Sequence, residues 1–236
     1  NTPLQITRKL FPSVNKAAFI EQFELVNTSV QRCNVELGFV PVVLKTDADK
    51  GVYGEYILEA NCSKTGKFIV EPSGKLSFAV VYTGRKPGEE KYQYSAAYEL
   101  LKREKFVQEV FRNLILETPN DTINEEFAFA KIRATESIYD TKGGLMHGPG
   151  GSAYYAAIWA NDQAEYVNPF FPFLGNLEGN ESAINSYRMF AGYMNPEYKP
   201  IPSSIVAEGV DFWNGAGDRC DQAMIAYGAS RFSLTY

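Results

Sequence analysis

The sequence contains one histidine and three cysteines, and this scarcity excludes several kinds of active site. A single histidine, His147, cannot supply a metal site with two histidine ligands, and it argues against a Ser-His-Asp triad. Cys33, Cys62 and Cys220 lack metal-site spacing, and their odd number leaves one unpaired, so we expect all three to be free. We therefore expect no metal site.

Positive charge and long apolar runs are also missing. The 23 Lys and Arg residues are outnumbered by 28 Asp and Glu residues, which gives a net charge of −5. No basic stripe is present to neutralise phosphates, so we do not expect nucleic acid as a partner. No apolar run approaches the roughly 20 residues of a membrane span, so a membrane is not expected as a partner either.

Aromatic residues, by contrast, are abundant. They make up 14% of the 236 residues, with 15 Tyr and 16 Phe, within an apolar fraction of 45%. An aromatic excess suits a protein that binds carbohydrate, and a large hydrophobic core explains it equally well. The length predicts one large domain or two ordinary domains.

The pattern of residues 1–92 predicts β structure. Short turn signals with glycine, such as residues 49–51 and 64–66, divide this part of the chain. Short strands at this spacing predict an antiparallel β-sandwich with a structural role, since it contains no catalytic constellation. The expected strands are residues 18–26, 35–44, 53–59, 67–70 and 76–82.

From residue 93 to residue 236 the apolar period becomes helical. The clearest helix has apolar residues at three- and four-residue steps from Ile123 to Ile138, and Thr122 with Glu125 forms a capping-box pattern at its start. We expect an extended, proline-rich segment at residues 198–204. The other expected helices begin near Tyr94, near Asp162, at Asn180 and at Asp218.

Two segments of the helical part repeat a pattern of tryptophan followed by acids. Trp159 precedes Asp162 and Glu165, and Trp213 precedes Asp218. One helical hairpin separates the two copies, so both are expected at the same end of a helical array. Tryptophan offers a flat apolar face to a pyranose ring, and carboxylates bind hydroxyls or transfer protons. The repeat therefore predicts a sugar site.

Helix capping explains the same acids without any chemistry. Asp162 and Glu165 have capping-box spacing, and a cap is the commoner reason for an acid at a helix start. The two explanations are compatible. The helix dipole favours ionised Asp162 and Asp218, which suits hydroxyl binding or water activation. Glu165 lies one turn in and becomes a better proton donor if its surroundings are apolar, so Glu165 and Asp218 are the candidate catalytic residues.

The candidate substrate-binding residues are more numerous than the catalytic ones, and each has an ordinary alternative. Arg219 could bind a sugar hydroxyl or form an ion pair with Asp221. His147 lies in a glycine-rich loop at residues 143–151, where it could contact a ligand or be an ordinary loop residue. The full set is Trp159, Asp162, Trp213, Arg219 and His147.

Four segments together carry a family resemblance. Residues 116–131, residues 148–162 and residues 213–230 look like the openings of successive helical hairpins, and residues 6–28 look like strands of a preceding β-sandwich. The chain thus resembles the six-hairpin, (α/α)6-barrel glycoside hydrolases, especially bacterial relatives of glycogen-debranching and α-L-rhamnosidase-type enzymes. The implied fold is a β-sandwich (1–92) followed by the first hairpins of an incomplete (α/α)6 barrel (93–236).

The resemblance also implies an activity. It implies a glycoside hydrolase that cleaves an oligo- or polysaccharide with inversion, in the periplasm or the cytoplasm of a bacterium. This reaction requires no cofactor. A six-hairpin barrel has twelve helices, and about five are expected here. The catalytic acid and base could therefore lie beyond Tyr236, with the remainder of the polypeptide as a partner. The alternatives are a non-catalytic carbohydrate-binding or interaction protein, and a glycoside phosphorylase.

Overall fold

The computed structural model describes residues 3–50, 53–148, 157–206 and 219–236, and for Arg219 it describes the backbone alone. The chain forms two compact units, Asn1–Phe106 and Val107–Tyr236. The division falls inside helix α1 (Ala96–Arg112), which begins shortly after the predicted change from strands to helices at residue 92. The assignment of a sandwich domain to residues 1–92 and of barrel hairpins to residues 93–236 stays a prediction.

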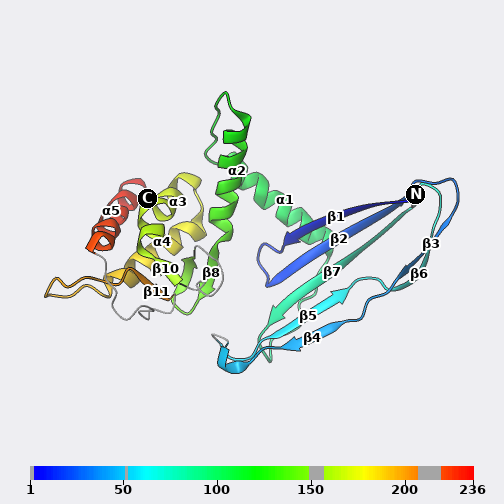
Figure 1. Cartoon of the computed structure of the whole chain (residues 1–236), viewed down its shortest axis with the longest axis horizontal. Coiled ribbons are helices and arrows are strands. Elements are labelled where there is room, and N and C mark those ends of the chain that lie inside the picture. Colours follow the sequence, from blue (N-terminus) through cyan, green and yellow to red (C-terminus); the bar gives the residue numbers. More distant parts are fainter. Residues whose placement is uncertain (1–2, 51–52, 149–156, 207–218) are drawn as a thin grey trace. The chain divides into compact units, whose positions relative to one another are not determined.

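The first unit is built on an antiparallel sheet of five strands in the order β1-β2-β7-β5-β4 (Figure 1). A separate ribbon pairs β3 (Cys33–Leu37) with β6 (Gly66–Val70), and a short turn, η1 (Ala48–Lys50), lies between β4 and β5. The strands of the five-stranded sheet are β1 (Leu4–Pro12), β2 (Ala18–Asn27), β4 (Val42–Lys45), β5 (Ile57–Cys62) and β7 (Lys75–Arg85).

The two faces of the five-stranded sheet are covered by different elements. The register places Ile20 opposite Val81 on one face, where Leu100 of α1 packs against them. Leu25 and Leu76 are opposite each other on the other face, and the apolar side of the β3–β6 ribbon packs there. Successive residues of a strand point to opposite faces, so the alternating sequence of β2 and β7 explains both contacts.

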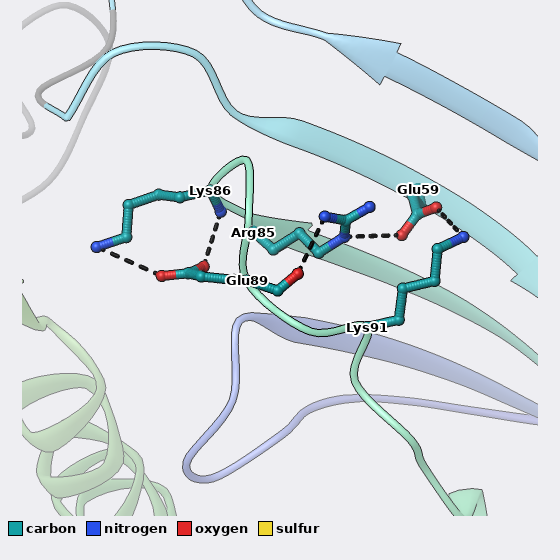
Figure 2. A network of polar contacts seen from close by, with 5 residues as sticks. All are labelled: Glu59, Arg85, Lys86, Glu89 and Lys91. Carbon is teal, nitrogen blue, oxygen red and sulfur yellow. Dashed lines mark hydrogen bonds and ion pairs between the residues drawn. The ribbon is translucent and has the colours of Figure 1, made fainter.

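Ion pairs hold the segment that follows β7 against the sheet (Figure 2). The buried carboxylate of Glu59 lies 2.8 Å from Nζ of Lys91 and 3.3 Å from Nε of Arg85. The hydrogen bond from Lys91, helped by Arg85, holds the pKa of Glu59 below its usual value, although burial opposes the shift. The backbone N–H of Lys86 donates to the Glu89 carboxylate at 2.7 Å and closes the turn.

The second unit is mainly helical. Two short pairs of strands accompany the helices: β8 (Ile138–Thr141) with β9 (Gly144–His147), and β10 (Ala157–Trp159) with β11 (Ser204–Val206). The predicted fold class, an antiparallel β region followed by a helical part, is confirmed (Figure 1). Besides the end of α1, the helices are α2 (Asp121–Glu136), the π-helix η3 (Asp162–Val167), α3 (Asn168–Leu174), α4 (Leu177–Ala191) and α5 (Arg219–Thr235).

Helices η3, α3, α4 and α5 share one core. Phe171 and Ala183 are fully buried in it, next to Phe232 of α5. Helix α5 approaches the π-helix at Gly228, where an added Cβ would lie 2.5 Å from the Cα and carbonyl oxygen of Ala164. Only glycine permits so close a backbone approach. Within the described ranges, no helix has both the length and the apolar character needed to cross a membrane.

Several predicted element bounds were wrong, for local reasons. The alternation over residues 35–44 predicts one strand, and the chain forms β3 and β4 instead. Pro41 lies in the break and has no N–H to donate to a ladder. Thr122 does not cap α2; the side chain of Asn120 accepts hydrogen bonds from the N–H groups of Thr122 (3.0 Å) and Ile123 (3.4 Å). Strands β8 to β11 have three or four residues, too few for a recognisable alternation.

Candidate functional site

One pocket of the second unit contains two of the predicted site residues. It has a volume of about 440 Å³, and its walls come from α2, β9, the π-helix and α3. His147 and Asp162 meet there, although they come from different elements and were predicted as separate candidates. The lining residues are Ala130, Arg133, Ala134, Ser137, His147, Asp162, Tyr166, Val167 and Phe170.

The π-helix brings Asp162, Tyr166 and Val167 to the pocket wall. The Tyr166 hydroxyl donates a hydrogen bond to the Asp162 carboxylate. Burial, followed by the neighbouring Asp162 carboxylate, raises the pKa of Tyr166, so the phenol stays protonated. Segments of π-helix occur frequently at functional sites, and this one orients an acid and a phenol toward the same space.

His147 ends β9 as a buried residue with its main chain fixed on both sides. Its N–H donates to Ser182 Oγ at 2.6 Å, and its carbonyl accepts from Gln163 Nε2 at 2.7 Å. The imidazole packs edge-on against Phe171 with ring centres 6.0 Å apart. Burial lowers the pKa of His147 to about 4, so the ring is neutral at neutral pH.

One ring nitrogen of His147 has no hydrogen-bond partner among the described residues. This nitrogen, Nδ1, is buried. A buried polar atom without a partner is costly and is expected to find one in a ligand or a water molecule. His147 lines the pocket, and its neutral ring is the polar group of the β9 wall.

The pocket combines an apolar surface with a small number of polar groups. Ala130, Ala134, Val167 and Phe170 supply the apolar part, and Arg133, Ser137, His147, Asp162 and Tyr166 supply the polar part. This combination suits a small ligand with an apolar face and several hydroxyl groups. Among the described residues, no group of three His, Cys, Asp or Glu side chains is arranged to hold a metal ion.

Asp162 is not the capping residue that its sequence context predicts. Ala160 and Asn161 are already helical, and no side chain caps the start of η3. The Asp162 carboxylate is instead engaged by Tyr166, one turn further along. The capping interpretation was wrong because Asp162 already lies inside the helix, whereas an N-cap residue has a non-helical backbone.

The other predicted site residues are less closely connected to the pocket. Trp159 belongs to strand β10 and is paired with Ser204 of β11. Glu165 is exposed and does not line the pocket, so it lacks the apolar surroundings that would make it a better proton donor. Arg219 begins α5. Trp213 and Asp218 lie outside the described residues.

Sequence reasoning missed three polar residues of this pocket: Arg133, Ser137 and Tyr166. Arg133 reaches it from α2, and only the packing of α2 beside β9 and η3 reveals this. Tyr166 did carry a signal, since it follows Asp162 by four residues on a helix, the spacing at which side chains meet. A search for polar pairs at this spacing would have found it.

Comparison with known proteins gives a likeness of fold. No family model matches this sequence, and no curated protein matches it. A solved structure described as "Putative kojibiose phosphorylase from human microbiome" superimposes with a TM-score of 0.66 at 11% sequence identity. The likeness covers 97% of this chain and 39% of that chain, so this chain spans about two fifths of the length of that structure. At this identity the two chains share a fold: a β-sandwich followed by part of a six-hairpin helical barrel.

Proposed function

We propose that this chain belongs to a carbohydrate-active protein and binds a sugar ring in the pocket formed by α2, β9 and η3. The observation that carries the proposal is the pairing of an apolar wall with convergent hydroxyl-binding groups in one pocket. The fold shared with a protein described as a phosphorylase of the disaccharide kojibiose supports it.

Each polar group of the pocket has a role that a sugar can satisfy. The Asp162 carboxylate accepts hydrogen bonds from hydroxyls, and the neutral imidazole of His147 can donate one or accept one. Phe170 and Val167 line the pocket and would pack against the C–H surface of the ring. Trp159, Trp213 and Arg219 remain proposed contacts to further sugar units, from the tryptophan repeat and its neighbouring cation.

We propose further that the whole protein cleaves the glycosidic bond of an oligo- or polysaccharide with inversion. One carboxylic acid then protonates the leaving oxygen, while a carboxylate takes a proton from the attacking water. Glu165 and Asp218 are the candidates within this chain. The side chain of Glu165 is exposed, which does not favour a proton donor. The alternative is that the remainder of a longer polypeptide supplies the acid and the base.

Phosphorolysis is the second candidate reaction, and the name of the similar structure favours it. A phosphate oxygen would attack the anomeric carbon in place of water, and the leaving oxygen would again take a proton from an acid. The products would be a sugar 1-phosphate and the shortened saccharide. Incubation with disaccharides, with and without inorganic phosphate, separates the two reactions: hydrolysis releases free sugar in both samples, and phosphorolysis requires phosphate.

Sugar binding by the 236-residue chain is the direct test of the pocket. We expect a neutral disaccharide from a panel to bind weakly in a calorimetric or NMR titration. Asp162→Asn should weaken binding about tenfold to a hundredfold, since a hydrogen bond to a charged group contributes about 1.5–3 kcal/mol. Asp140→Asn is the matched control, because Asp140 is an exposed acid of β8 outside the pocket. Equal affinities for the two variants would remove Asp162 from the site.

A purely binding protein is distinguished by the same samples. Sugar binding that depends on Asp162, without turnover by the intact protein under either condition, would favour the binding or interaction protein. Turnover by the 236-residue chain alone would show that acid and base both lie within it, and Glu165→Gln would then be the first variant to assay.

A further inference from the structure

One face of the five-stranded sheet is apolar and only partly covered. We call it the ribbon face, since the β3–β6 ribbon packs against its Leu25 and Leu76 end. The cross-strand register assigns the other residues to this face, because directly opposite residues of antiparallel strands point the same way. The ribbon face comprises Leu4, Ile6, Arg8, Leu10, Pro12, Phe19, Glu21, Phe23, Leu25, Asn27, Leu76, Phe78, Val80, Tyr82, Gly84, Leu58, Ala60, Cys62, Val42 and Leu44.

Large apolar side chains remain exposed on this face, most of them away from the end that the ribbon covers. Their exposed fractions range from 39% for Phe19 to 62% for Ile6. They extend across the sheet from its edge strand β1 to its other edge strand β4, so they form one surface. The exposed members are Ile6, Leu10, Phe19, Tyr82, Leu58, Val42 and Leu44. An apolar surface that is continuous over five strands marks an interaction site.

The charges of the ribbon face cancel. Within the strands of the sheet, its two charged residues are Arg8 and Glu21, and they pair with each other at 2.9 Å. The opposite face, covered by α1, carries Lys9, Glu24 and Lys75 among others, as the same register requires. A face with no net charge can meet an identical face without repulsion between like charges.

We propose that the ribbon face packs against the ribbon face of a second copy of this chain. The contact is sheet on sheet, the arrangement by which two apolar sheet faces form the core of a sandwich. It continues an interface already present within the chain, where the ribbon packs on the same face at Leu25 and Leu76. The pairing of identical faces gives the two-fold symmetry of most homodimers. The proposal is independent of the sugar site.

The mass of the chain in solution tests the proposal, by light scattering or sedimentation over a range of concentrations. We expect a dimer. Leu10→Lys should raise its dissociation constant about tenfold or more, because a charge would enter an apolar interface. Thr7→Lys is the matched control on the opposite face of β1 and should change the constant less than about twofold. Leu10 lies opposite Glu21 and Thr7 lies opposite Glu24, so each new lysine has an acid beside it in the monomer.

Circular dichroism melting of both variants checks that they fold, and Leu44→Lys on β4 is a second disrupting variant should Leu10→Lys fail to fold. A monomer at every concentration, or equal weakening by Leu10→Lys and Thr7→Lys, would overturn the proposal. A monomer would direct attention to a further segment of a longer polypeptide as the partner of this face.

Discussion

The contact between α5 and the π-helix gives the most demanding prediction. In Gly228→Ala, the new Cβ would lie 2.5 Å from both the Cα and the carbonyl oxygen of Ala164. Both are backbone atoms of a buried segment, so one helix has to shift. Overpacking costs about 1–3 kcal/mol, and two backbone contacts this short place the cost at the upper end. Replacing glycine by alanine inside a helix stabilises the helix by about 1 kcal/mol, because alanine has the higher helix propensity.

The balance is a loss of about 2 kcal/mol, because the clash is larger than the gain in helix propensity. For a unit of this size we expect a melting temperature lower by about 4–8 °C, measured by circular dichroism. Ser230→Ala is the control, since Ser230 is an exposed residue of the same helix. It should change stability by less than about 0.5 kcal/mol.

Gly228→Ala should also change the geometry of the pocket. Ala164 lies between Asp162 and Tyr166 on the π-helix, so a shift of that segment moves two lining residues. We expect weaker sugar binding by Gly228→Ala in the titration described for Asp162. A melting temperature equal to or above that of the unaltered protein would refute the reasoning, because helix propensity alone predicts that result.

Three further predictions follow from buried polar groups. Because the pKa of Glu59 is lowered, its ion pairs stabilise the first unit fully at pH values above the usual carboxyl pKa. This stabilisation is lost as the pH falls through the lowered pKa. Glu59→Gln should therefore reduce the dependence of the melting temperature on acid pH. The pKa of His147 is about 4, so stability should fall as the pH drops from about 6.5 toward 4. NMR titration of the imidazole should show no protonation near pH 6, and His147→Gln should remove this part of the pH dependence. Lys131 donates from Nζ to three carbonyls at the end of α1, at 3.2, 2.8 and 3.0 Å. Lys131→Met should cost about 1–3 kcal/mol in denaturant unfolding by leaving these carbonyls unpaired, and an unchanged midpoint would contradict that role.

The sequence by itself determined the order of element types. Strand alternation before residue 92 and helical periodicity after it are local patterns, because each residue's face is set by its neighbours along one element. Local sequence also made Asp162 a candidate through its position after Trp159, and His147 a candidate through its glycine-rich loop. None of the three cysteines, all of which are described, forms a disulfide, as their spacing and odd number had predicted.

Only the tertiary structure decided which of these residues act together. Arg133, His147 and Asp162 come from three elements, and their meeting depends on the packing of α2, β9 and η3. The neutral state of His147 depends on burial by residues distant in sequence, so a loop position gave no indication of it. The replacement of a predicted Asp162 cap by a bond from Tyr166 likewise depends on how β10 leads into the helix. Burial and non-local contacts set these features, and no pattern within a single element encodes them.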